Sequence, residues 1–527
     1  MKQLRKFTFL IIALLFLINE IRGQSRWVQQ YLETLNAASR NMSIAYDEGY
    51  LLTGNIIPNY QFTWLIKTDV NGEILWERKI WGYYDRIIID YFKQNEEGEI
   101  FLGGSVYLDG NTDAMIMKLN ACGEKEWCRT LSTTSNNDFF MDLVNTPDGG
   151  CAGLIFGAFY PLYQYRMGIL RFSSDGDLMW QQYYQSYDPG VWDEELSDLI
   201  VTPDSGYLMS GWCYYPDNDN PDLYWLHPYY IKTDSLGNVE WEIVLHGETG
   251  DLGGEAWATI IDPTQKYFYS CISHYYTSDT LYSKRPALVK IDLQGNVVGV
   301  YDLVHQDYDW GVLYSAAFIN DSLLAGGAGW GYNENDMLSR AIVFDTLGNI
   351  KDSLTLLNTG WLSKTAVTYD GKLLFYNTIE ENGDFDTYLF KLTQDLEQDT
   401  FYTTTFVYDS LCPYQIVSDT IVPDDCGVIV GMEEKHGGRE AGGRGGLEIW
   451  PNPAKEVVNC RLSIVDCRSN CSLMIYDIFG RKVKEIKVPV GQNEVQINVE
   501  GYPTGIYLIL LKGGQNIRAS AKFVIAK

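Results

Sequence analysis

The stretch Lys67-Thr68-Asp69-Val70-Asn71-Gly72-Glu73-Ile74-Leu75-Trp76 decides the fold, because its spacing of Lys, Asp, Gly and Trp returns along the chain. Three further copies end in Trp, and weaker copies follow at Lys290, at Asp345 and at Lys391. Successive glycines lie about 50 to 60 residues apart, and a fixed period of this length indicates a repeat architecture. We count seven copies, whose marker positions are Asp69, Gly72, Trp76, Gly123, Trp127, Gly176, Trp180, Asp234, Gly237, Trp241, Gly295 and Gly348.

A second marker runs in phase with the first. It reads EGYLLTG from Glu48, EGEIFLGG from Glu97 and DSGYLMSG from Asp204, with degenerate versions in the other copies. The residues between these turns alternate or run apolar for four to eight positions, which is typical of strands. Each repeat is therefore predicted to hold about four strands.

Four antiparallel strands that recur with this period indicate the blade of a β-propeller. One blade cannot bury both faces of its sheet, so neighbouring blades must cover each other, and ring closure removes long exposed edges. Trp27 precedes the first EGYLLTG marker, while the seventh copy has no Trp after Lys391. We therefore expect an all-β, seven-bladed propeller whose last blade the N-terminal strand completes; a linear β-solenoid is the alternative.

The marker residues are expected to serve folding. Gly and Asp suit the hairpin turn between the third and fourth strands, because Gly adopts positive φ and Asp bonds nearby backbone amides. The repeated Trp is expected to pack between blades. Over residues 26 to 410 the pattern resembles the seven-bladed propeller repeats of large exported bacterial proteins.

The composition excludes some functions. The chain has 527 residues with 69 Asp and Glu against 40 Lys and Arg, a net charge of −29. This balance argues against a nucleic-acid ligand, since phosphate contacts need clustered Lys and Arg. Residues 447–527 carry 11 Lys and Arg against 7 Asp and Glu, a net charge of +4, so the preceding residues carry −33. Two parts of different character are joined there.

The N-terminus is predicted to be an export signal. Lys2, Arg5 and Lys6 precede an apolar run from Phe7 to Ile18, and small residues follow near Gly23. The run is too short to span a bilayer, which favours a signal peptide over residues 1–23 and a mature chain from about Gln24. No later stretch is long and apolar enough to be a transmembrane segment. The predicted location is the cell surface or the medium, reached through the periplasm.

An exported chain permits disulfides, and this one has ten Cys. Proximity suggests two pairs, Cys122 with Cys128 and Cys412 with Cys426. Connectivity does not follow from sequence, and reduced buried thiols remain the alternative for each pair.

The propeller is predicted to span residues 24–410. A Cys- and Pro-containing segment and a Gly-rich linker follow over residues 411–446, and a small β-sandwich over residues 447–527. The motifs of the sandwich closely resemble the type A sorting domain of type IX secretion substrates in Bacteroidota. The resemblance implies export across the outer membrane by the type IX machinery, often with later removal of the domain. The residues that carry it are Pro451, Asn452, Pro453, Ala454, Asp477, Gly480, Arg481, Gly505, Ile506, Tyr507 and Lys522.

No catalytic site follows from the sequence. The five His show no metal-ligand spacing, and no nucleophile elbow, P-loop or dinucleotide fingerprint is present. An acidic run offers oxygen ligands for calcium at Asp217, Asp219 and Asp222, but it lacks the Gly and the distal Glu of a calcium loop, so a solvated acidic loop is favoured and no cofactor is expected.

Ligand binding is expected on the propeller face that carries the second-to-third loops, because these loops vary in length. Their aromatic and acidic side chains would suit sugar rings or a cation-bridged contact, although loops that only cap the propeller are the simpler explanation. The candidate residues are Tyr214, Tyr215, Tyr224, Trp225, His274 and Tyr275.

We therefore expect a non-enzymatic binding protein, with a ligand that the sequence does not identify. A secreted carbohydrate-active enzyme, with carboxylates on the loop face or in the channel, is the first alternative. A structural component of the cell surface is the second.

Overall fold

In the computed structural model, every regular element among the described residues is a β-strand. The chain divides into two compact units, Met1–Gly431 and Met432–Lys527, which are described separately. The structure describes residues 27–31, 36–56, 62–82, 86–108, 111–132, 138–159, 164–188, 190–216, 224–245, 253–278, 281–305, 310–333, 336–357, 361–381, 384–423, 425–430, 447–450, 454–455, 457–462, 471–477, 482–489, 492, 494–503, 505–513 and 516–525.

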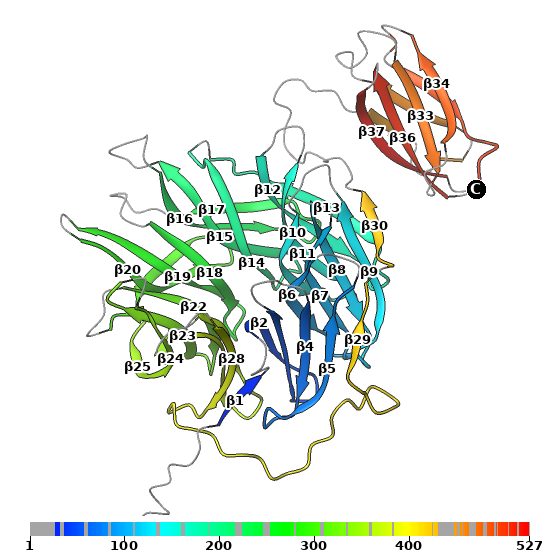
Figure 1. The fold of residues 1–527 in the computed structure, drawn as a ribbon. Coiled ribbons are helices and arrows are strands. Elements are labelled where there is room, and N and C mark those ends of the chain that lie inside the picture. The colour runs from blue at the N-terminus through cyan, green and yellow to red at the C-terminus, as the bar shows by residue number, and fades with distance from the viewer. Residues whose placement is uncertain are drawn as a thin grey trace, which may run out of the picture. The chain divides into compact units, whose positions relative to one another are not determined.

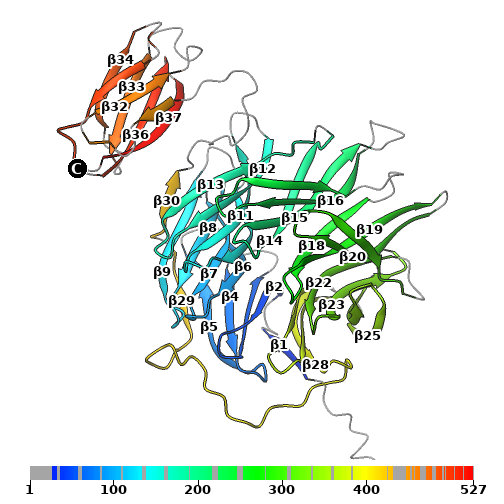
Figure 2. The ribbon, with the colours of Figure 1, turned by 180° about the vertical axis from the view of Figure 1, so that it is seen from behind.

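The first unit is a β-propeller built from antiparallel sheets in which consecutive strands pair (Figures 1 and 2). The all-β propeller arrangement expected from the repeat is thus confirmed. The first two sheets consist of β2 (Ala37–Ile44), β3 (Tyr50–Ile56), β4 (Thr63–Thr68) and β5 (Ile74–Ile80), and of β6 (Arg86–Gln94), β7 (Ile100–Leu108), β8 (Asn111–Leu119) and β9 (Lys125–Ser132). The next two consist of β10 (Phe139–Asn145), β11 (Cys151–Phe159), β12 (Gln164–Phe172) and β13 (Leu178–Tyr184), and of β14 (Asp193–Val201), β15 (Tyr207–Pro216), β16 (Tyr224–Thr233) and β17 (Val239–Val244).

The following strands form one hydrogen-bonded sheet of eight. Its two halves are joined by one parallel bridge, between Lys284 and Trp310. The halves consist of β18 (Gly253–Ile261), β19 (Tyr267–Ser278), β20 (Leu281–Asp292) and β21 (Val297–Asp302), and of β22 (Trp310–Phe318), β23 (Leu323–Gly331), β24 (Leu338–Asp345) and β25 (Ile350–Leu357). The hydrogen-bonded sheets therefore do not divide into the seven separate groups that the repeat predicts.

The last sheet closes the ring with a strand from the start of the chain. It contains β26 (Trp361–Val367), β27 (Leu373–Glu381), β28 (Asp384–Leu392) and β1 (Val28–Tyr31), and β1 pairs antiparallel with β28. The first strands of successive sheets contact one another from β2 through β26 and back to β2. These first strands therefore surround the central axis.

The repeated Gly and Trp interlock neighbouring sheets. Gly72, Gly123, Gly176, Gly237, Gly295 and Gly348 all adopt φ between 68° and 85°. A methyl group on Gly176 would lie 2.6 Å from Trp127 of the preceding sheet, and one on Gly72 would lie 3.0 Å from Trp27. The turn after β28 has Leu396 at φ 54° in place of Gly, and this Leu is buried.

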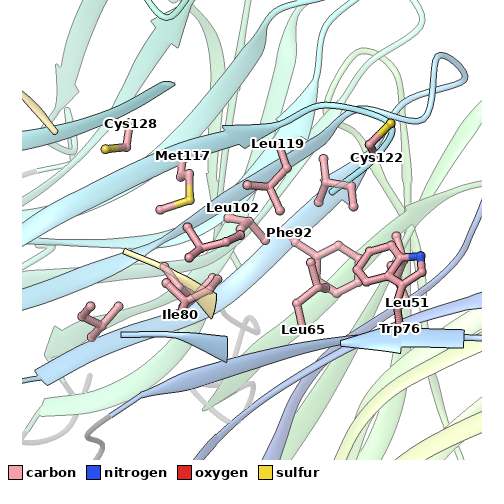
Figure 3. Close-up of a cluster of buried hydrophobic side chains, with 14 of the residues drawn as sticks. Leu51, Leu65, Trp76, Ile80, Phe92, Leu102, Met117, Leu119, Cys122 and Cys128 are labelled. Carbon is pink, nitrogen blue, oxygen red and sulfur yellow. The ribbon is translucent and has the colours of Figure 1, made fainter. Parts of the chain in front are cut away.

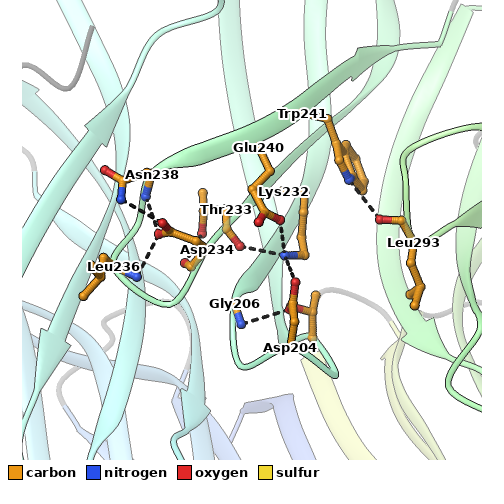
Figure 4. A network of polar contacts seen from close by, with 11 residues as sticks. Asp204, Gly206, Lys232, Thr233, Asp234, Leu236, Asn238, Glu240, Trp241 and Leu293 are labelled. Carbon is orange, nitrogen blue, oxygen red and sulfur yellow. Dashed lines mark hydrogen bonds and ion pairs between the residues drawn. The ribbon is translucent and has the colours of Figure 1, made fainter.

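Buried cations at the ends of the third strands are also structural. Lys232 Nζ lies 2.8 Å from Asp204 Oδ2 and 2.7 Å from Glu240 Oε2, and it donates to the Thr233 carbonyl oxygen (Figure 4). Lys67 repeats the arrangement with Asp47 at 2.5 Å. Because a buried charge must be paired, these repeated carboxylates stabilise the turns and are not candidates for ligand contacts.

Apolar side chains fill the space between the sheets. The cluster between β2–β5 and β6–β9 contains Trp76, Phe92, Leu102 and Met117, and it reaches Cys122 and Cys128 (Figure 3). Burial of this kind on both faces of each sheet explains why the strands read as nearly continuous apolar runs.

The segment after β28, residues 399–430, is a strap that lies against the sheets β2–β5 and β6–β9. It adds β29 (Asp419–Ile421) in parallel to β5 and β30 (Gly427–Val430) in parallel to β9. Trp76 Nε1 donates to Asp409 at 3.1 Å, and Arg78 donates to the Val417 carbonyl oxygen. The strap thus covers two outer sheet edges.

Two disulfides fix the strap. They join Cys122 to Cys412 and Cys128 to Cys426. The four cysteines expected to pair do so, but the pairing suggested by proximity in sequence is wrong. The reason is that the strap returns to the edge of β9, which brings residues nearly 300 positions apart into contact.

The second unit consists of two sheets, β31-β32-β35 and β34-β33-β36-β37, that share one apolar core. Ala454 and Tyr507 are buried, Asp477 ends β33, Gly505 begins β36, Ile506 lies in β36 and Lys522 lies in β37. The motif residues Pro451, Asn452, Pro453, Gly480 and Arg481 lie outside the described residues. The strands are β31 (Leu447–Trp450), β32 (Val457–Leu462), β33 (Cys471–Asp477), β34 (Lys482–Val488), β35 (Glu494–Asn498), β36 (Gly505–Gly513) and β37 (Asn516–Ile525).

Candidate functional site at the channel

Each innermost strand of the propeller carries one extra residue at the same place. The register of the first and second strands shifts by one residue there, as in a β-bulge. The described side chains at these positions are all half-buried, whereas most of their neighbours in sequence are buried. Because the first strands surround the axis, the bulges lie on the inner ring of the propeller, and the side chains of Met141 and Tyr314 also pack against apolar clusters between the sheets. The bulged residues are Arg40, Asp90, Met141, Ser197, Trp257, Tyr314 and Ser363.

Two bulged aromatic residues belong to a group that we call the acid–aromatic cluster, which comprises Glu195, Trp212, Glu255, Trp257 and Tyr314. The ring centroids of Trp212 and Trp257 lie 5.7 Å apart, and those of Trp257 and Tyr314 lie 5.6 Å apart in an edge-on arrangement. All five side chains are half-buried. The cluster thus combines flat apolar rings with two carboxylates. Glu195 and Glu255 lie near the start of β14 and β18, Trp257 and Tyr314 lie in the middle of β18 and β22, and Trp212 lies in β15.

The carboxylates of the cluster influence each other. Burial raises the pKa of Glu195, and the nearby charges of Asp193 and Glu255 raise it further. Glu255 Oε2 accepts from Lys284 Nζ at 2.6 Å and from Ser273 Oγ at 2.8 Å. The ammonium group of Lys284 therefore offsets part of the negative charge of Glu255.

Tyr314 and Trp257 complete the polar contacts of the cluster. Burial, followed by the charge of Glu255, raises the pKa of Tyr314 to about 12, so its hydroxyl stays protonated. Trp257 Nε1 donates to Ser273 Oγ at 3.3 Å. Ser273 thereby links the indole of Trp257 to the carboxylate of Glu255.

A second pair of carboxylates, Asp142 and Asp198, follows the bulges of β10 and β14. Each accepts a backbone N–H from the next sheet, Asp142 from Leu199 at 3.1 Å and Asp198 from Thr259 at 2.7 Å. Both side chains are buried. Burial, with the neighbouring charge of Asp142, raises the pKa of Asp198 to about 6.

This pair should make stability depend on pH. The folded state favours the protonated form of Asp198, because the pKa of this carboxyl is raised to about 6 on folding. The contribution of Asp198 to stability is therefore fully present below about pH 4 and is lost as the pH rises through about 6. Asp198→Asn keeps an oxygen that accepts from Thr259 and removes the charge. We expect the variant to be more stable than the wild type by up to about 3 kcal/mol at pH 8 and equally stable near pH 4. Urea unfolding at both values measures this, and parallel pH profiles would contradict it.

The sequence-predicted ligand residues lie in strands. Tyr214 and Tyr215 are in β15, Tyr224 and Trp225 in β16, and His274 and Tyr275 in β19. His274 and Tyr275 are buried, and His274 Nδ1 lies 2.8 Å from Asp302. Tyr275 is linked to the acid–aromatic cluster through Lys284, whose Nζ lies 5.0 Å from the Tyr275 ring centre and 2.6 Å from Glu255 Oε2.

The proposed calcium ligands Asp217, Asp219 and Asp222 lie outside the described residues. Within the described ranges, no group of three His, Cys, Asp or Glu is placed to hold a metal ion.

Two cavities lie away from the channel. One of about 350 Å³ lies under the strap, beside Arg78, Cys122 and Tyr414. One of about 230 Å³ is lined by Trp27, Leu356, Leu396 and other apolar residues. Both cavities adjoin residues that pack the fold together. The acid–aromatic cluster, which combines rings and carboxylates, is therefore the stronger candidate for a ligand-binding site.

Sequence reasoning missed the acid–aromatic cluster, because none of its residues belongs to a repeated marker. An alignment of the seven first strands would have placed Trp257 and Tyr314 at one shared position. It would not have identified that position as a bulge.

Comparison with known families identifies the second unit. A family model described as a secretion system C-terminal sorting domain matches residues 448–526. No curated protein matches the chain. Over the part that the structure describes, no helix is long and apolar enough to cross a membrane.

The chain also resembles solved structures at low identity. They include a protein of unknown function from Dyadobacter fermentans (11% identity, TM-score 0.40, 57% of this chain and 93% of that chain). A second is a periplasmic gluconolactonase from Pseudomonas aeruginosa (11% identity, TM-score 0.37, 60% of this chain and 85% of that chain). A third is an α-L-arabinanase from Penicillium chrysogenum (12% identity, TM-score 0.36, 58% of this chain and 92% of that chain). Likenesses this weak assign no activity. The chain is a β-propeller protein with a type IX C-terminal sorting domain, which directs it to the cell surface or the medium.

Proposed function

We propose that this exported propeller binds carbohydrate chains at the acid–aromatic cluster without chemically changing them. The observation that carries the proposal is the pair of half-buried rings, Trp212 and Trp257, beside Glu195 and Glu255. Sugar rings present apolar faces that stack on indole and hydroxyls that donate to carboxylates. The proposal needs no cofactor, and calcium at residues 217–222 remains a prediction.

A binding experiment tests this function. The full chain is screened against neutral oligosaccharides by calorimetry, with Trp257→Ala as the site variant and the exposed Trp192→Ala as the matched control. We expect Trp257→Ala to weaken binding at least about tenfold and Trp192→Ala to leave it unchanged. Equal affinity of the wild type and Trp257→Ala, or no carbohydrate binding at all, would contradict the proposal.

Turnover is the second candidate function, because the raised pKa of Asp198, beside Asp142, suits a general acid. Oligosaccharide cleavage that is abolished in Asp198→Asn while binding persists would favour an enzyme.

We also propose that the propeller has seven blades. The eight-stranded sheet counts as two, since one bridge joins its halves and each half pairs like the other blades. We place the end of the propeller after Val430, because β29 and β30 extend its sheets. The signal peptide, residues 1–23, lies outside the described residues and stays a prediction.

Export through the sorting domain has its own test. Deletion of residues 447–527 should trap the protein in the periplasm, as measured by fractionation of the producing cells. Unchanged secretion of the truncated chain would refute this role.

A further inference from the structure

We propose that the acid–aromatic cluster selects ligands that carry a protonated amine, so that the bound carbohydrate is an amino sugar chain. The inference rests on the proposed function and adds the chemical class of the ligand.

The first argument is the balance of charge. The charges of Asp193 and Glu255 both act on Glu195, and the ammonium group bonded to Glu255 comes from Lys284. Burial and the two neighbouring carboxylates both raise the pKa of Glu195, so a cation beside it would relieve repulsion. An acidic ligand would add to that repulsion.

The second argument is that the protein already holds an ammonium group here in the way we propose. Lys284 Nζ lies 2.6 Å from Glu255 Oε2 and 5.0 Å from the ring centre of Tyr275. A carboxylate and an aromatic face together bind a cation better than either alone, because the ring adds a cation–π contact. Glu195 with Trp212 and Trp257 offers the same pair of groups to a ligand.

The third argument is the field of the whole molecule. The residues before the sorting domain carry a net charge of −33. Such a surface speeds the approach of cations and slows that of polyanions. The long-range electrostatic attraction and the local contacts of the cluster therefore both favour ligands that carry a positive charge.

The test compares two ligands that differ only in the nitrogen group of each sugar, which is a protonated amine in one and a neutral acetamide in the other. Glucosamine oligomers and N-acetylglucosamine oligomers of equal length are titrated into the full chain at about pH 6 and about 150 mM salt, where long-range attraction is screened. We expect the amine form to bind at least about tenfold more tightly. Glu195→Gln should remove most of this preference, because it weakens binding of the amine form far more than binding of the acetylated oligomer. The exposed Glu96→Gln should change neither affinity.

The outcomes separate the two proposals. Equal or tighter binding of the acetylated oligomer would overturn the amine preference and leave carbohydrate binding intact. A preference that survives Glu195→Gln would overturn it too, because the net charge alone would then explain it. Binding of spermidine that depends on Glu195, with neither oligomer bound, would support amine recognition and contradict carbohydrate binding.

Discussion

Replacing Cys122, Cys128, Cys412 and Cys426 together by Ser is expected to lower the free energy of unfolding by about 9 kcal/mol, whereas losing either disulfide alone costs about 3 kcal/mol. The reason is that the two bridges close overlapping loops. Either bridge alone spans about 290 residues, and once it is present the other closes a loop of only about 20. The loss should therefore be strongly non-additive.

Chemical denaturation of the two paired Cys→Ser variants and of the quadruple variant measures these differences. The matched control is each variant with reductant, which should change the single-bridge variants to the level of the quadruple variant and leave that variant unchanged. Additive losses would show that the strap stays folded against β5 and β9 without the disulfides, and would contradict the account based on overlapping loops.

The disulfides also show where sequence reasoning ends. The four cysteines are recognisable as candidates, because each lies beside a turn or a Pro-rich segment. Their pairing depends on the path of the strap back to the edge of β9, which no local pattern encodes. Proximity in sequence is a poor guide when a terminal segment crosses the fold.

The repeat was predictable because ring packing imposes it on every copy. Gly72 and Gly176 have the positive φ that the turn requires, and the indoles of Trp27 and Trp127 lie against them. Leu396 breaks the rule, since no Trp precedes it in the β25 strand and its side chain is buried beside Leu354 and Leu356 instead. At this turn the large side chain belongs to the turn residue, Leu396, and the facing strand β25 contributes Leu residues and no Trp. The turn therefore keeps its positive φ without Gly.

The candidate site was not predictable for the opposite reason. Glu195 and Trp212 come from one sheet and Glu255 from the next, and only two of the seven first strands carry Glu two residues before the bulge, so no repeated marker includes them. The bulge that Trp257 and Tyr314 share on the innermost strands is a shift in pairing, which strand patterns do not reveal. The proposed binding site therefore depends on residues that depart from the repeat.

Trp27→Ala is expected to destabilise the propeller by about 3 to 5 kcal/mol, the range for truncating a buried Trp. Trp27 is 1% exposed, lies against Gly72 of the neighbouring sheet and precedes a strand of only four residues. Because β1 supplies the pairing that closes the ring, loss of its anchor should free β28 and the edge of the β2–β5 sheet.

Urea unfolding measures the loss, and hydrogen exchange shows where it falls. The exposed Trp192→Ala should change stability by less than about 0.5 kcal/mol, which controls for the residue type. Amide protection in β28 and β2 should fall more than in β11 and β15, on the far part of the ring. Uniform loss of protection would mean that the ring opens as one unit, whereas unchanged stability would show that β1 does not close it.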